Sequence, residues 1–256
     1  MRFLIVAVAI YSTGIFAALK TQMVDYKDGD VALQGYLAYD TKFKGSRPAV
    51  LVVHEWMGLD AYAKKRTDML ASLGYIAFAA DIYGKGVFPK SSEEAMKVSG
   101  DWKANPMLLR TRAQAAINTL IAQKNVNAKK IAAIGYCFGG TTVLELARAG
   151  TEIQGVVSFH GGLGSKAAAK LEGTIKTKVL VLHGADDPFV KADEVEGFVE
   201  EMQKTKANWE LVSYGNSVHK FTTPEAGNDP SKGFAYNEQS DKRSWEAMKA
   251  FFKEIL

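Results

Sequence analysis

One cysteine, Cys137, lies in the hexapeptide GYCFGG at positions 135–140. The apolar run Lys130–Ile134 precedes this hexapeptide and a helical pattern, Thr141–Ala149, follows it, so the spacing predicts a strand, a tight turn and a helix. Glycines permit strained backbone angles and close approach, so the central side chain would project from the turn while the next helix presents free amides. This geometry suits a nucleophilic thiol.

Two later segments supply an acid and a base. Asp186 and Asp187 follow the apolar run Lys178–Leu182, and His219 follows the run Trp209–Tyr214. The order nucleophile, acid, histidine is that of hydrolases built on a strand-turn-helix nucleophile corner. A thiol is mostly protonated at neutral pH, so it needs a base, and an aspartate would orient that base. The spacing from Gly184 favours Asp187, while Asp186 stays open because one residue of boundary error would exchange them.

The elements that would position these residues alternate between strands and helices. This alternation predicts an α/β fold with a mostly parallel sheet, helices on both faces and an N-terminal antiparallel hairpin over Met23–Asp40. Ligands in such sheets bind outside the carboxyl ends of the strands. The predicted strands are 49–53, 75–80, 130–134, 153–159, 178–182 and 209–214, and the predicted helices are 61–73, 92–98, 107–123, 141–149, 193–204 and 240–255. The irregular segment 216–236 is the predicted cover of a site.

Composition limits the alternatives. With 256 residues, 47% of them apolar, the chain can form one domain, predicted over 18–256. The net charge of +4 is small and unclustered, which argues against nucleic acid as a partner. A lone cysteine excludes an internal disulfide. His54, His160 and His183 lack the spacing of zinc ligands and are interpreted as structural, so we expect no metal and no other cofactor.

The first 17 residues have the pattern of a secretory signal peptide. Arg2 is followed by the apolar run Phe3–Ile10 and by small residues at 17–18, and polar residues at 11–14 interrupt the run. The run is shorter than the roughly 20 residues that a membrane-spanning helix needs. We expect an exported protein, periplasmic or secreted, with no stable membrane insertion after cleavage; the cleavage site stays open.

Several motifs follow the predicted strands: GYCFGG, His54-Glu55-Trp56-x-Gly58, Asp81-Ile82-Tyr83, Gly184-x-x-Asp187-x-Phe189-Val190 and Val218-His219-Lys220-Phe221, with Ser244-Trp245 in the last helix. Taken together, these motifs resemble those of the dienelactone hydrolase family of α/β-hydrolases. The resemblance covers nearly all of the chain after the leader, and it implies the α/β-hydrolase fold and catalytic roles for Cys137, Asp187 and His219. It also implies an oxyanion hole formed by the amides of Phe138 and Trp56, and a contact between Glu55 and the resting thiol.

Two departures concern the substrate. Lys85 and Thr223 stand where family members acting on dienelactone have carboxylate-binding arginines, and neither residue offers the planar, two-pronged fit of a guanidinium. We therefore expect a substrate other than dienelactone, with Tyr83 and Lys85 as possible substrate contacts.

The predicted function is hydrolysis of a small carboxylic ester, lactone or thioester through a thioacyl intermediate on Cys137. A non-catalytic binding protein of the same fold and a redox-reactive thiol protein are the alternatives. The oligomeric state stays open.

Overall fold

The computed structural model describes residues 19–166 and 175–256, so the predicted signal peptide lies outside the described residues. The strands are β1 (Leu19–Asp28), β2 (Val31–Asp40), β3 (Arg47–Val53), β4 (Ile76–Ala80), β5 (Val126–Tyr136), β6 (Gly155–Phe159), β7 (Lys178–Gly184) and β8 (Trp209–Tyr214). The helices are α1 (Ala61–Ser72), α2 (Ser92–Lys103), α3 (Pro106–Ile121), α4 (Phe138–Arg148), α5 (Ala192–Lys204) and α6 (Glu238–Ile255), with short 3₁₀ turns η2 (Pro224–Ala226) and η3 (Pro230–Lys232).

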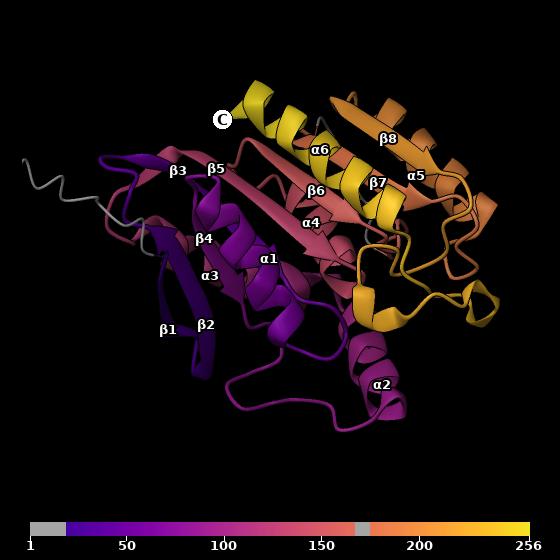
Figure 1. The fold of residues 1–256 in the computed structure, drawn as a ribbon, viewed down its shortest axis with the longest axis horizontal. Coiled ribbons are helices and arrows are strands. Elements are labelled where there is room, and N and C mark those ends of the chain that lie inside the picture. Colours follow the sequence, from indigo (N-terminus) through magenta and orange to yellow (C-terminus); the bar gives the residue numbers. More distant parts are fainter. Residues whose placement is uncertain (1–18, 167–174) are drawn as a thin grey trace, which may run out of the picture.

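The strands form one sheet in the order β1-β2-β4-β3-β5-β6-β7-β8 (Figure 1). β1 and β2 are an antiparallel hairpin, β2 is antiparallel to β4, and all remaining neighbours are parallel. The hairpin turns through Gly29, whose φ of +57° is the left-handed conformation that two-residue hairpin loops require. The predicted α/β-hydrolase fold is confirmed, including its N-terminal hairpin.

Helices cover both faces of this sheet (Figure 1). One layer of core packs α1 and α6 against alternate residues of the central strands, and the other packs α3, α4 and α5 against the opposite face. The short strands β4 and β6 are buried along their whole length, as expected for parallel strands covered on both sides. In the described ranges, no helix is both long and apolar enough to cross a membrane.

The register aligns the carboxyl ends of the parallel strands. Val53 of β3 pairs with Gly135 of β5, and Tyr136 of β5 pairs with Phe159 of β6. Further along the sheet, Phe159 pairs with Leu182 of β7, two residues before that strand ends. The segments that follow these strands therefore leave the sheet at one edge, and they carry the predicted site residues.

Helix α4 begins at Phe138, three residues earlier than the predicted start at Thr141. The helix can start there because Gly139 packs directly on the backbone that follows β3. A Cβ at Gly139 would lie only 2.2 Å from the carbonyl oxygen of Val53. Cys137 is thereby the residue that caps α4, which makes the turn tighter than the sequence pattern suggested.

The segment 216–236 also has more structure than predicted. It contains both 3₁₀ turns, and His219 forms a parallel β-bridge with Phe234. Hydrogen bonds from the His219 N–H to the Gly233 carbonyl and from the Ala235 N–H to the His219 carbonyl hold this bridge. The backbone of His219 is therefore fixed on both sides.

Candidate active site

Cys137 occupies a strained backbone position between β5 and α4. Its φ of +52° and ψ of −113° lie outside the regions that non-glycine residues ordinarily adopt, and such strain costs about 1–3 kcal/mol. The Cys137 N–H donates to the Phe159 carbonyl of β6 at 3.0 Å. Gly135 makes the corner possible, since a Cβ there would lie 2.0 Å from the Gly139 carbonyl oxygen. The fold thus maintains the strain at the thiol.

A hydrogen-bonded path connects Cys137 to an acid through His219. The Nε2 atom of His219 lies 3.1 Å from the Cys137 Sγ, and its Nδ1 lies 2.7 Å from Oδ2 of Asp187. The other carboxylate oxygen of Asp187 accepts the Phe189 N–H at 2.9 Å. Asp187 is buried, whereas Asp186 is exposed and uses its own N–H to bond the Ser217 carbonyl. Between the two aspartates, the structure places Asp187 against His219.

The surroundings of His219 keep its imidazole protonated. Burial disfavours the charged ring, but the Cys137 sulfur and the Asp187 carboxylate outweigh burial and raise the pKa of His219 from 6.5 to about 10. Both ring nitrogens then carry protons, one directed at the carboxylate and one at the sulfur. A cationic imidazolium next to sulfur is the setting in which cysteines react as nucleophiles.

Two aromatic rings meet His219 edge-on. The Phe189 ring centroid lies 5.4 Å from that of His219, and the His160 centroid lies 5.2 Å away. Burial, together with the nearby positive His219, holds the pKa of His160 well below its usual value, so His160 is neutral. Its Nε2 is 2.8 Å from the Thr222 hydroxyl. His160 was interpreted as structural, and its packing places it against the candidate base.

Glu55 has partners other than the thiol. Its carboxylate pairs with Lys220 Nζ at 2.7 Å and accepts the Thr223 hydroxyl at 3.2 Å, while the Cys137 sulfur bonds His219. Burial opposes the positive charge of Lys220, but Glu55 outweighs it and raises the pKa of Lys220. Lys220 was not among the predicted site residues. The signal available was a lysine directly after His219 and a buried acid that requires a cation.

The two amides predicted for the oxyanion hole follow β3 and β5. Within residues 19–166 and 175–256, neither the Trp56 N–H nor the Phe138 N–H donates a hydrogen bond to another group. Tyr83, a predicted substrate contact, is buried and donates its hydroxyl to the Trp56 carbonyl at 3.0 Å. Lys85 lies apart, because its Nζ pairs with exposed Asp25 of β1 at 2.8 Å.

Comparison with known proteins identifies the family. The family model described as "Dienelactone hydrolase family" matches residues 33–256. The chain belongs to the dienelactone hydrolase family. The resemblance predicted from the motifs is therefore confirmed, and with it a hydrolase fold and class associated with ester and lactone bonds.

Solved structures and curated relatives agree with this assignment. A dienelactone hydrolase-like promiscuous phosphotriesterase from metagenomic libraries is 39% identical, with a TM-score of 0.85 over 93% of this chain and 99% of that one. Among curated proteins, an uncharacterised protein of Caenorhabditis elegans is 35% identical over 58% of this chain and 94% of its own length. A protein of Aquifex aeolicus, provisionally named carboxymethylenebutenolidase, is 28% identical over 92% of this chain and 99% of its own length.

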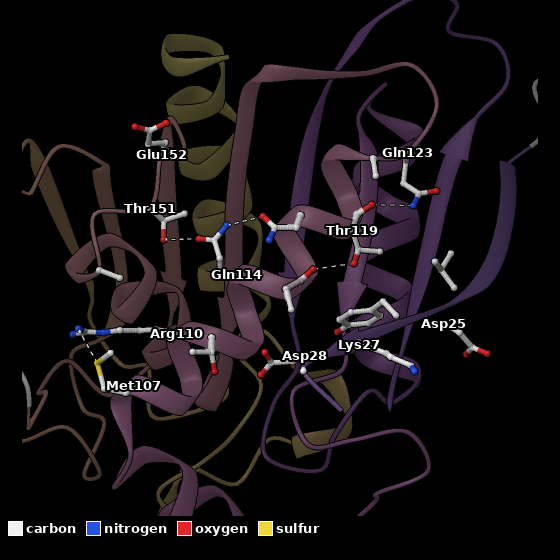
Figure 2. A pocket seen from close by; sticks show the side chains of 18 of the residues that line it. Asp25, Lys27, Asp28, Met107, Arg110, Gln114, Thr119, Gln123, Thr151 and Glu152 are labelled. Atoms are coloured by element: carbon white, nitrogen blue, oxygen red, sulfur yellow. Dashed lines mark hydrogen bonds between the residues drawn. The ribbon is translucent and has the colours of Figure 1, made fainter. Parts of the chain in front are cut away.

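In this dienelactone hydrolase family member, a small hollow lies beside the candidate active site and a larger groove lies away from it. The small hollow, of about 140 Å³, includes Phe189, which packs on His219, and Thr141, one turn after Cys137. The larger groove, of about 1160 Å³, lies over α3, between β1 and the segment 149–152, and is lined by paired polar side chains such as Gln114 and Thr151 (Figure 2). None of the Cys137, Asp187 and His219 side chains lines the larger groove.

In the described ranges, no group of three or more histidine, cysteine, aspartate or glutamate side chains is arranged to hold a metal ion. The groups that meet at the candidate site are the Cys137 thiol, the His219 imidazole and the Asp187 carboxylate.

Proposed function

We propose that this dienelactone hydrolase family member hydrolyses activated carboxylic esters, lactones or thioesters through a thioacyl intermediate on Cys137. The observation that carries the proposal is the position of His219, which bridges the Cys137 sulfur and the Asp187 carboxylate at hydrogen-bond distance. The sulfur also belongs to a partly exposed residue at a strained strand-to-helix corner.

The reaction has two halves. In the first, the Cys137 sulfur forms a bond to the carbonyl carbon, and the negative charge on the carbonyl oxygen is stabilised by the amides of Phe138 and Trp56. The carbon–oxygen or carbon–sulfur bond of the leaving group then breaks, and His219 gives the leaving group its proton. In the second half, His219 takes a proton from water, the resulting hydroxide attacks the thioester, and the acid leaves while the sulfur is released. Asp187 orients His219 throughout.

The nucleophile limits the leaving group. A thiolate departs from a tetrahedral intermediate more readily than an alkyl alkoxide, so the intermediate returns to substrate unless the other group also leaves easily. Enolates, phenolates and thiolates meet this condition. We expect p-nitrophenyl acetate to be hydrolysed far better than ethyl acetate, and equal kcat/KM values for the two esters would contradict this part of the proposal.

Detection of the acyl-enzyme is the direct test. After rapid mixing with p-nitrophenyl acetate and acid quenching, mass spectrometry should find one added acetyl group on the peptide that contains Cys137. Cys137→Ala should lose the acetyl group and at least about 10³-fold in kcat, the scale seen when a nucleophile is removed. Asp186→Asn, at the exposed neighbour of Asp187, is the matched control and should behave as wild type. Undiminished turnover by Cys137→Ala would refute the mechanism.

The similarity to a promiscuous phosphotriesterase favours a second candidate activity. That relative is 39% identical over 93% of this chain, a degree of similarity that extends across the whole described fold. We propose phosphotriester cleavage as a side activity of the same site. Hydrolysis of paraoxon should be measurable in wild type and absent in Cys137→Ala, and activity that survives in the variant would place it elsewhere.

We also propose that the protein is exported. The proposal is supported by Arg2, the apolar run that follows it and the small residues near position 17. Determination of the N-terminus in the periplasmic or secreted fraction of an expressing bacterium should find a chain that starts close to residue 18. An intact N-terminus in the cytoplasmic fraction would contradict export.

A further inference from the structure

We propose that His54 is a positioning residue that aims the Trp56 amide at the substrate oxyanion, an assignment that rests on the proposed function of the site. His54 follows β3 directly and is completely buried. Its hydrogen-bond partners are Glu55 and Ile82, and its ring contacts are Tyr83 and Phe138. These residues belong to the segment after β3, the segment after β4 and the start of α4.

The hydrogen bonds of His54 determine its tautomer. Its Nδ1 lies 2.5 Å from the carbonyl oxygen of Glu55, which can only accept, so Nδ1 carries a proton. Its Nε2 lies 3.3 Å from the backbone nitrogen of Ile82, which can only donate, so Nε2 carries none. The ring is therefore neutral, and burial, which lowers its pKa, favours the same form.

The bond to Glu55 orients the next amide. The carbonyl of Glu55 and the N–H of Trp56 belong to one planar peptide unit, and no cis peptide bond occurs in the described ranges. In a trans unit the two groups point in opposite directions, so a donor that holds the oxygen directs the N–H away from His54. The same bond also polarises the unit and strengthens the N–H as a donor. A second donor, the Gly58 N–H at 3.3 Å, holds the same oxygen.

The ring of His54 also contacts the other half of the proposed oxyanion hole. It stacks on Phe138 with centroids 5.7 Å apart and an interplanar angle of 15°, and it meets Tyr83 edge-on at 4.9 Å. Tyr83 in turn bonds the Trp56 carbonyl, which belongs to the following peptide unit. One buried ring thus connects the segment after β3 to the first residue of α4.

Three substitutions separate positioning from simple packing. His54→Asn retains a side-chain N–H close to the position of Nδ1, His54→Gln places its amide near Nε2 instead, and His54→Phe retains only the ring. Loss of one oriented oxyanion donor typically costs about 10²–10³ in kcat. We therefore expect His54→Gln and His54→Phe to lose about 10²-fold in kcat for p-nitrophenyl acetate with little change in KM, and His54→Asn to stay within about tenfold of wild type.

The rate at which iodoacetamide alkylates Cys137 distinguishes positioning from packing damage. Packing damage would lower this rate together with kcat, whereas loss of the oriented amide would lower kcat alone. Alkylation forms a carbon–sulfur bond and releases iodide without creating an oxyanion, so its rate should be the same in all three variants and in wild type. Loss of kcat with an unchanged alkylation rate supports the inference. An unchanged kcat in His54→Gln, or a parallel fall of both rates, overturns it.

A measurement on the wild-type protein keeps the inference falsifiable if a buried substitution prevents folding. Nitrogen-edited NMR of the imidazole should show His54 protonated on Nδ1 and unprotonated on Nε2, and a proton on Nε2 overturns the assignment. Failure of the proposed function has a different signature, because Cys137→Ala would then turn over as wild type whatever the His54 variants do.

Discussion

The two ends of helix α4 hold two clusters of polar groups that are built in different ways. At the N-terminal end, Cys137 and His219 meet through a single hydrogen bond of 3.1 Å. At the C-terminal end, Arg148 bonds both carboxylate oxygens of Glu201 at 2.7 Å and pairs with Glu145 at 3.1 Å. Glu145 also pairs with Arg110 at 2.7 Å, so each acid of this ion network faces a guanidinium.

The two clusters differ in whether their groups can transfer protons, and therefore in whether they serve the reaction or the stability of the fold. Guanidinium groups stay charged at every accessible pH, so the cations of the ion network formed by Arg110, Glu145, Arg148 and Glu201 do not exchange protons. The cluster at the other end uses a thiol and an imidazole, between which a proton can pass, and it sits on a residue with a φ of +52°. Breaking each cluster should therefore affect different properties of the protein.

The largest expected effect is on turnover when the base is removed. His219→Gln leaves the Cys137 sulfur without its proton partner, so kcat/KM for p-nitrophenyl acetate should fall by at least about 10³-fold. The stability at neutral pH should fall far less than in variants of the ion network. Turnover and thermal unfolding of the same preparation test both statements, and a variant with near wild-type turnover would contradict the role of His219.

The next effect is on stability when the ion network is broken. Arg148→Met removes the cation that faces two buried carboxylates, so the free energy of unfolding should fall by about 3–5 kcal/mol. At a temperature where the variant is still folded, kcat should stay within about threefold of wild type, because the change of about 0.65 kcal/mol in activation energy is small. Lys97→Met, which breaks the exposed pair with Asp101, is the control and should unfold as wild type in urea.

The Lys220–Glu55 pair shares features with both clusters. The Lys220–Glu55 pair lies at the site but resembles the ion network, because a buried carboxylate faces one cation. Lys220→Met should lower the free energy of unfolding by about 1–3 kcal/mol, the cost of an unsatisfied buried group. It should also lower kcat/KM by about tenfold, or about 1.4 kcal/mol, by disturbing the segment next to His219. A loss of stability alone would group the Lys220–Glu55 pair with the ion network, and a loss of kcat/KM alone would group it with Cys137 and His219.

The smallest effect is a pH dependence that only the site should show. The folded-state pKa of His219, about 10, lies above its ordinary value of 6.5. Its contribution to stability is therefore full below pH 6.5 and is lost as the pH rises to about 10. The difference in melting temperature between wild type and His219→Gln should shrink by a few degrees, about 2–4 °C, between pH 6 and pH 10. A constant difference would contradict the raised pKa.

The sequence predicted the fold and the order of the site residues well because both depend on local patterns. Short apolar runs predicted each parallel strand, and the residues after those runs necessarily gather at one edge of the sheet. For the same reason the sequence could indicate Cys137, Asp187 and His219 as one set. The predicted helix start at Thr141 was wrong by three residues, because the close contact of Gly139 with the β3 segment is not a local property.

The α/β architecture, the family and the identities of the polar residues at the strand ends follow from local sequence patterns. The partners of these residues depend on the tertiary structure. It placed Asp187 rather than Asp186 against His219, paired Glu55 with Lys220, directed Lys85 to Asp25 and gave His54 its two opposed backbone partners. Hydrogen bonds and ion pairs depend on distances of a few tenths of an ångström between residues far apart in the chain, and a linear pattern contains no such distances.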